Sequence, residues 1–223
     1  GEMPAGAGFY PADMTKEEFE AWDDPNKTSL YTLIKRDENG KLQSVWYHEA
    51  YAEQIQKAAD LLLKAADLAG DKEFADYLRL RSKALLTDEY FESDMAWMDV
   101  RNNNVDFVVG PIENYVDALY GYKAAHEAFI LIKDHAWSKQ LAHYAELLPE
   151  LQTQLPVATE YKAEKPGADA DLAVYDAVFY GGDCNMAGKT IAINLPNDEQ
   201  VQLQKGTRKL QLKNAMKAKF DNI

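Results

Sequence analysis

The sequence predicts an α+β fold, in which helices and strands come from different parts of the chain. Two observations predict it. From Tyr47 to about Leu86, apolar residues recur at three- and four-residue intervals, which is the period of a helix that buries one face. Beyond residue 104, short apolar runs are separated by turns rich in Gly, Pro and Asp, which is the pattern of β-strands.

Composition excludes several classes of partner. The 223 residues can bury a real core, as one large domain or two small ones. A net charge of −13 argues against nucleic acid, which binds to a basic face, and disfavours anionic membrane surfaces. No apolar run approaches the roughly 20 residues that span a bilayer. Cys184 is the single cysteine, so neither an internal disulfide nor a thiolate zinc site can form. Because the chain opens with Gly1 rather than Met, we expect the native start to be missing, and the compartment (cytoplasmic or periplasmic) stays open.

Residues 1–46 are expected to form an irregular arm, a short helix and a β-hairpin. Thr15 and Glu18 have the spacing of a capping box, which predicts a helix start at this point. Strand-like runs at 28–36 and 42–46 flank a turn at 37–40, and this arrangement predicts the hairpin.

Residues 47–104 are expected to form the helical segment. Gly70 separates two helices that make an αα-hairpin, and a third helix is expected at 88–98. No second copy of the hairpin follows, so it is a packing element and not a repeat. The first helix carries an apolar stripe made of Ile55, Ala58, Ala59, Leu62, Leu63 and Ala66.

Residues 105–223 are expected to mix strands and helices. Strand-like runs occupy 105–109, 128–132, 172–180 and 190–195, and helices are expected at 136–148, ending near Pro149, and at 206–220. The last helix has an apolar stripe and no cap before the chain ends, so we expect the natural protein to continue beyond it.

The first candidate site follows the strand-like run at 105–109. Gly110 and Pro111 break or bend this strand, and an extended pattern then resumes at residues 112–115. In a strand, residues i and i+2 share a face, so Glu113 and Tyr115 would point the same way. A carboxylate and a phenol that project together suggest a site. The alternative is a tyrosine at the sheet rim beside a solvated acid.

The second candidate site lies where the strand at 190–195 ends. Asn194 and Asn197 flank Pro196, which holds the backbone before it extended. Asparagine side chains offer donors and acceptors, so such a strand end can bind a peptide backbone. The alternative is a simple turn, in which Asn197 and Asp198 bond their own backbone.

Several familiar catalytic motifs are missing. His48-Glu49 and His126-Glu127 both begin like a zinc motif, but no histidine stands three residues beyond either glutamate. The chain has no Gly-rich phosphate loop, no nucleophilic serine elbow and no Glu-rich Nudix box. We therefore assign no metal ligand to this chain.

Together the two candidate sites resemble a known family. The run from Gly110 to Tyr115, continuing to Glu127 and Phe129, is similar to the Glu-Ser-Tyr strand and the following Glu-Gly-Phe of dipeptidyl-peptidase III zinc metallopeptidases. The run from Ile193 to Asp198 resembles that family's Asn-x-Pro-Asn strand, in the same order along the chain. The residues of these motifs are more similar to those of the bacterial members, and of the plant members fused to a Nudix domain, than to those of the animal enzymes.

The resemblance implies two lobes around a cleft, one with a five-stranded barrel-like sheet and the other helical and zinc-binding. We therefore expect a helical layer packed on an antiparallel barrel-like β-sheet, in the N-terminal, substrate-binding part of a zinc-dependent dipeptidyl peptidase. Zinc would be bound outside this chain, in a C-terminal lobe that is missing here, and the chain alone would be inactive. The other partner would be a peptide with a free N-terminus.

The resemblance also implies a role for each candidate residue. Glu113 and Asn197 would hold the amino terminus of the peptide, and Asn194 would bond its backbone. Tyr115 would be catalytic, as a hydrogen-bond donor at the scissile carbonyl. Val116 stands where the animal enzymes have Arg, so substrate preference is not carried over. Two other functions remain open: a non-catalytic peptide- or ligand-binding module, and a helical protein-interaction domain that uses the αα-hairpin.

Overall fold

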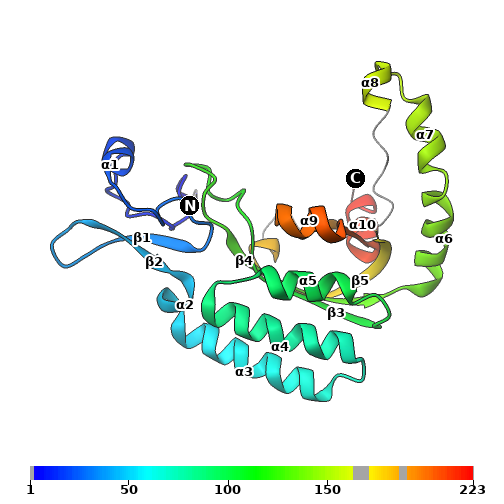
Figure 1. Cartoon of the computed structure of the whole chain (residues 1–223), viewed down its shortest axis with the longest axis horizontal. Coiled ribbons are helices and arrows are strands. Elements are labelled where there is room, and N and C mark those ends of the chain that lie inside the picture. The colour runs from blue at the N-terminus through cyan, green and yellow to red at the C-terminus, as the bar shows by residue number, and fades with distance from the viewer. Residues whose placement is uncertain (1–2, 163–170, 186–189, 223) are drawn as a thin grey trace.

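The computed structural model describes residues 3–162, 171–185 and 190–222. A helical layer lies along one side of a curled five-stranded sheet, an N-terminal hairpin stands at one end and a helical arm rises at the other (Figure 1). This arrangement confirms the predicted α+β class. Within the described residues, no helix is both long and apolar enough to cross a bilayer.

The N-terminal segment has its own small core. Helix α1 (Lys16–Ala21) begins at Thr15, whose side chain accepts a hydrogen bond from the backbone N–H of Glu18 at 3.1 Å. Strands β1 (Thr32–Arg36) and β2 (Leu42–Trp46) pair antiparallel, which confirms the hairpin. The strand begins later than predicted, because residues 28–31 lie in turns. The buried residues of this core are Phe19, Ile34 and Leu42.

The helical layer follows the predicted order. It consists of α2 (Tyr47–Ala50), α3 (Ala52–Leu68), α4 (Lys72–Thr87) and α5 (Phe91–Asp99). The predicted stripe on α3 is largely correct, since Ile55, Ala59, Leu62 and Ala66 are buried. Leu63 is an exception with 44% of its surface exposed, because the buried stripe is narrower than the apolar pattern.

The sheet has the strand order β3-β4-β5-β7-β6. Its members are β3 (Val105–Glu113), β4 (Ala125–Lys133), β5 (Asp171–Gly182), β6 (Ala192–Leu195) and β7 (Arg208–Leu212). All neighbours pair antiparallel except β5 and β7, which are parallel. Strand β3 continues through Gly110 and Pro111, where a break was one prediction, and a bulge between Pro111 and Glu113 bends it instead.

The predicted helix at 206–220 is wrong in its first part. Residues 208–212 form β7, and only α10 (Lys213–Phe220) is helical. Arg208, Leu210 and Leu212 are buried in alternation, which is the two-residue period of a strand. Helix α9 (Glu199–Lys205) was not predicted. It is capped by Asp198, whose carboxylate accepts from the backbone N–H of Gln200 and of Val201.

One hydrophobic core joins the helical layer to the sheet. It surrounds an ion pair in which the guanidinium of Arg208 donates to the carboxylate of Asp106 at 2.7 Å, with both side chains fully buried. The indole N–H of Trp97 donates to the same carboxylate at 2.9 Å. The layer and the sheet are therefore joined by polar contacts as well as by apolar packing.

The arm leaves the sheet after β4 and consists of α6 (His135–Ala145), α7 (Leu148–Gln154) and α8 (Thr159–Lys162). None of these helices contains a buried residue. The helix predicted at 136–148 ends slightly earlier, at Ala145, and Pro149 does not end it but lies in the first turn of α7, where the missing backbone N–H costs nothing.

Candidate binding groove

A groove of about 580 Å³ brings together all four site residues that the sequence predicted. Glu113 ends β3, Asn194 lies on β6, and Tyr115 and Asn197 lie in the turns that follow these strands. The further polar or titratable side chains that line it are Glu127, Asp183, Cys184, Thr190 and Lys219.

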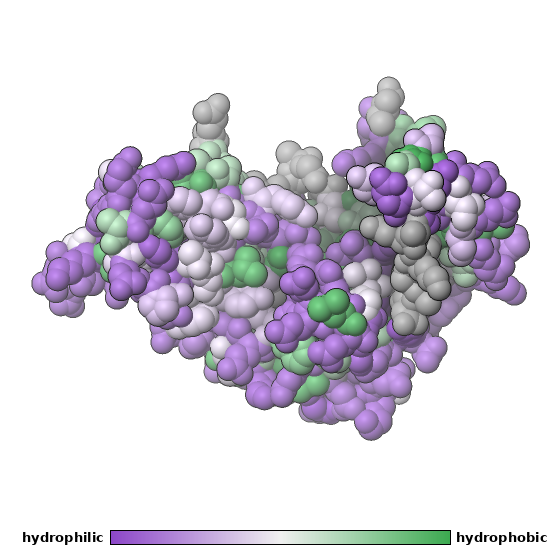
Figure 2. Space-filling view, turned by 45° about the horizontal axis from the view of Figure 1, so that its top comes forward, coloured by the Kyte–Doolittle hydropathy of each residue, from purple (hydrophilic) through white to green (hydrophobic). Residues whose placement is uncertain are grey.

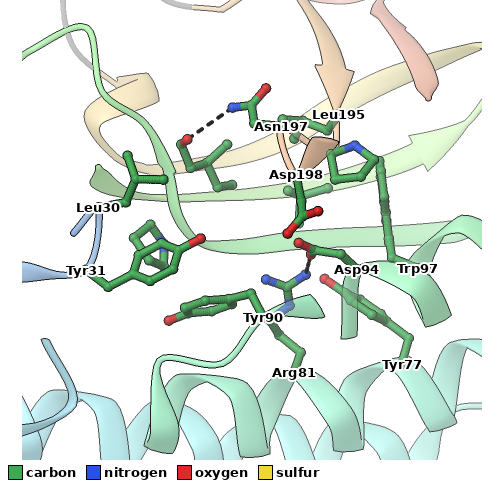
Figure 3. Close-up of a pocket in the computed structure, with 14 residues that line it drawn as sticks. Leu30, Tyr31, Tyr77, Arg81, Tyr90, Asp94, Trp97, Leu195, Asn197 and Asp198 are labelled. Carbon is green, nitrogen blue, oxygen red and sulfur yellow. Dashed lines mark hydrogen bonds and ion pairs between the residues drawn. The ribbon is translucent and has the colours of Figure 1, made fainter. Parts of the chain in front are cut away.

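Glu113 and Asn197 are in direct contact although they are 84 positions apart. The side-chain N–H₂ of Asn197 donates to the Glu113 carboxylate at 3.3 Å and to the backbone carbonyl of Ile112 at 3.1 Å. Figure 3 shows Asn197 reaching across toward this strand. Because β3 and β6 are the two edges of the sheet, this contact links the edges where the sheet curls round.

Tyr115 lies next to Glu113, but not for the reason that the sequence suggested. The strand ends at Glu113, so Tyr115 stands in a turn, with 77% of its surface exposed, and the i, i+2 rule does not apply. The charge of the Glu113 carboxylate, and a hydrogen bond to it, raise the pKa of the Tyr115 phenol. The phenol is therefore protonated at neutral pH and can donate a hydrogen bond.

The loop after Tyr115 is organised by Asp117, whose surface is only 2% exposed. Its carboxylate accepts from the hydroxyl of Tyr10 at 2.7 Å and from the backbone N–H of Tyr122 at 2.9 Å. The backbone N–H groups of Leu119, Tyr120 and Lys123 also donate to it. These bonds fix the loop that begins with Tyr115 against the N-terminal arm.

Glu127 is the groove residue that sequence reasoning did not assign to a site. It lies on β4 with 6% of its surface exposed, and among the described residues no side chain or backbone group bonds its carboxyl group. Burial, and then the charges of Glu113 and Asp183, raise the pKa of Glu127 to about 7. The available signal was the alternation of β4, in which Ala125, Glu127, Phe129 and Leu131 share the buried face.

The residues that the structure describes do not fit a zinc site. In the described part of the chain, no cluster of three or more His, Cys, Asp or Glu side chains could hold a metal ion. The ring of His48 pairs with Asp88 at 2.8 Å, and His126 packs against the rings of Tyr47 and Tyr51. Burial lowers the pKa of His126 to about 4 and raises that of the Cys184 thiol.

A smaller pocket of about 130 Å³ lies on the other side of Asn197 (Figure 3). Its floor is the guanidinium of Arg81, which is paired with Asp94, and the ring of Tyr31 and the carboxylate of Asp198 also line it. The two pockets share Ile112, Leu195 and Asn197 as a common wall.

Comparison with known proteins identifies the family. Residues 17–222 match Peptidase family M49. The structure of DPP III from Caldithrix abyssi is similar with a TM-score of 0.91 and 44% identity, over 98% of this chain and 43% of that one. The structure of dipeptidyl-peptidase III from Corallococcus sp. strain EGB is similar with a TM-score of 0.83 and 36% identity, over 97% and 42%. Nudix hydrolase 3 of Arabidopsis thaliana is 35% identical, over 99% of this chain and 32% of that protein.

The chain therefore belongs to peptidase family M49, and the resemblance to dipeptidyl-peptidase III enzymes is confirmed. It spans about a third of the length of the plant relative and less than half of the two solved enzymes.

Proposed function

We propose that this chain is the N-terminal, substrate-binding part of a zinc-dependent dipeptidyl peptidase that removes dipeptides from peptide N-termini. The contact between Glu113 and Asn197 in the groove carries the proposal. It joins an acid and an amide from opposite edges of the sheet at the position where the free amino group of a peptide would be held.

The chemistry of this pair suits an ammonium group. Both N–H₂ contacts of Asn197 are directed to Ile112 and Glu113, and its amide oxygen has no partner among the described residues. The Glu113 carboxylate and this oxygen can therefore both accept hydrogen bonds from one ammonium group. A bond between a carboxylate and an ammonium group is charge-assisted, so it is shorter and stronger than a neutral one. Such a clamp measures distance from the peptide's N-terminus.

The remaining two residues would orient the peptide backbone. Asn194 is exposed in the groove and can bond a peptide N–H or C=O group. The single O–H of Tyr115, which is bonded to Glu113 in the empty groove, can turn to donate to a carbonyl oxygen beyond the clamp. A donor that meets a developing oxyanion stabilises the transition state, which is the catalytic role proposed for Tyr115.

Zinc, in this proposal, is bound by residues outside this chain, and the described residues contain no cluster that could hold it. The arm supports a further partner lobe. Figure 2 shows a few hydrophobic residues among mostly hydrophilic ones at the upper right, where the arm stands. Large apolar or aromatic side chains are exposed along its three helices and beside them, and such side chains suit a contact with another lobe. These side chains are Trp137, Tyr144, Leu147, Leu148, Leu151, Leu155 and Tyr161.

The test is isothermal titration of a short peptide with a free amino terminus, and of its N-acetylated twin, into the metal-free chain. We expect the free peptide to bind, the acetylated peptide to fail, and Glu113→Gln to weaken binding about 10- to 100-fold, because a bond to a charged group contributes about 1.5–3 kcal/mol. Glu146→Gln, an exposed acid on the arm, is the matched control and should change nothing. Equal binding of the two peptides, or unchanged affinity in Glu113→Gln, would rule out the clamp.

A further inference from the structure

Glu127 is an acid that the fold buries in the groove, and no group of the described residues bonds its carboxyl group. Its cross-strand neighbours are Gly110 on β3 and Gly182 on β5, so no side chain stands beside it on either strand. A Cβ atom at Gly182 would lie 2.0 Å from the backbone oxygen of His126 and 3.3 Å from the Cα of Glu127, so only glycine fits there. Glu127 therefore lines the groove without a side chain from either of its paired positions.

The titratable groups that line the groove with Glu127 are mostly acids. They are Glu113 on β3, Tyr115 in the turn after it, Asp183 and Cys184 in the short helix after β5, and Lys219 on α10. Of the described residues that line the groove, Lys219 is the one cation, and it is exposed and makes no ion pair with Glu127. β6 contributes no titratable side chain to this wall. The empty groove thus holds an excess of acid.

We propose that Glu127 is a second carboxylate ligand for the cationic group that binds beside Glu113, and that it is protonated in the empty groove and ionises when the cation arrives. The proton leaves the Glu127 carboxyl group for the solvent, and no covalent bond changes. The inference rests on the proposed function in one respect, namely that the ligand carries a positively charged amine.

Electrostatics gives the reason for this coupling. When two carboxyl groups share a site that excludes water, ionising both is unfavourable, so one of them retains its proton. Burial and the charge of Glu113 act in this direction, and they raise the pKa of Glu127 to about 7. A cation within about 4–6 Å favours the ionised form instead and lowers a carboxyl pKa by roughly 1–3 units. At pH 6, binding should therefore release most of one proton.

The test is isothermal titration of the free-amine peptide at pH 6, in two buffers of different ionisation enthalpy. The peptide's own amine stays charged, because its pKa is about 7.7–8.0. We expect release of roughly 0.5–1 proton per peptide bound by the unmodified chain and of none by Glu127→Gln, whose affinity should be constant between pH 5.5 and 7. Asp183→Asn, the matched control in the same groove, should still release a proton.

The outcomes separate the two proposals. No binding of the peptide would overturn the amino-terminus clamp and, with it, any ligand role for Glu127. Binding without proton release, or with equal release in Glu127→Gln, would overturn the present inference and leave the clamp standing. ¹³C NMR of the side-chain carboxyl groups, assigned with Glu127→Gln, gives a test without ligand. Titration of Glu127 between pH 6 and 8 is expected, and titration below pH 5 would also overturn the inference.

Discussion

Two buried acids on neighbouring strands of the sheet have opposite surroundings. Asp106 on β3 is fully buried and receives hydrogen bonds from Arg208 and Trp97. Glu127 on β4 is nearly as buried and receives none from the described residues. Burying a charge is costly unless it is paired and hydrogen-bonded. The comparison indicates that the paired acid stabilises the fold, whereas the unpaired acid is maintained at a cost to stability and is available to a ligand.

The buried charges of the loop after Tyr115 are paired in the same way as Asp106. The ammonium group of Lys123 is fully buried and donates to the backbone oxygens of Lys27 and Ser29, both at 2.9 Å, and to the hydroxyl of Thr32 at 2.8 Å. Three acceptors match its three N–H donors. With Asp117, this lysine fixes the loop without using any residue of the groove.

The largest expected effect comes from breaking the paired acid. Arg208→Met removes the guanidinium and leaves Asp106 buried without its cation, which should lower the free energy of unfolding by about 3–5 kcal/mol. Urea unfolding at pH 7 measures this loss of unfolding free energy. Lys72→Met is the matched control, because Lys72 pairs with Asp76 on the surface of α4 and its loss should hardly move the midpoint. An equal loss of unfolding free energy in both variants would mean that the buried Arg208–Asp106 pair stabilises the fold no more than a surface pair does.

Local signals predicted most of the fold but not how the sheet closes. The capping pair at Thr15 and the three-to-four-residue period of α3 depend on nearby residues, so they could be recognised in the sequence. β7 was mistaken for a helix, because its five residues run directly into α10 and share one amphipathic stretch. Its parallel pairing with β5 joins Asp171 to Arg208, and no local pattern encodes such a distant contact.

The candidate site also depends on contacts between distant residues that local signals do not predict. Locally, Glu113 resembles a solvated acid and Asn197 a turn residue, and only the resemblance to a family brought them together. The physical link is the hydrogen bond from Asn197 across the two sheet edges, which exists only after the sheet has curled. Glu127 belongs to the motif that carries the resemblance, but it was given no role, because locally it is only the partner of His126 in an incomplete zinc motif on a strand that alternates in burial.

Replacing the unpaired acid, Glu127, should stabilise the fold, in contrast to the loss of stability expected for Arg208→Met. Glu127→Gln should raise the free energy of unfolding by about 3–4 kcal/mol at pH 8, because each pKa unit corresponds to 1.36 kcal/mol. The pKa of Glu127 is raised to about 7 in the folded chain, against about 4.3 unfolded. Its stability contribution is therefore complete below pH 4.3, declines as the pH rises through 7, and is lost above that.

The pH dependence separates this effect from simple repacking. Urea unfolding of the variant and the unmodified chain should give nearly equal free energies at pH 4.5 and diverge steadily up to about pH 7.5. His126 titrates oppositely, since its pKa is lowered to about 4, but it is present in both proteins and cancels in the difference. A constant difference at all pH values would show that Glu127 is ionised, and therefore compensated, throughout.

The smallest expected effect tests whether a well-paired acid tolerates the loss of one donor. Tyr10→Phe removes the 2.7 Å hydrogen bond to Asp117, while four backbone N–H groups still donate to that carboxylate. A single net hydrogen bond contributes about 1 kcal/mol, so the midpoint of thermal unfolding should fall by a few degrees. Tyr161→Phe, on the exposed arm, is the control and should leave it unchanged. A loss as large as that of Arg208→Met would mean that the backbone donors do not compensate the Asp117 charge, and the contrast between paired and unpaired acids would then depend on side-chain partners alone.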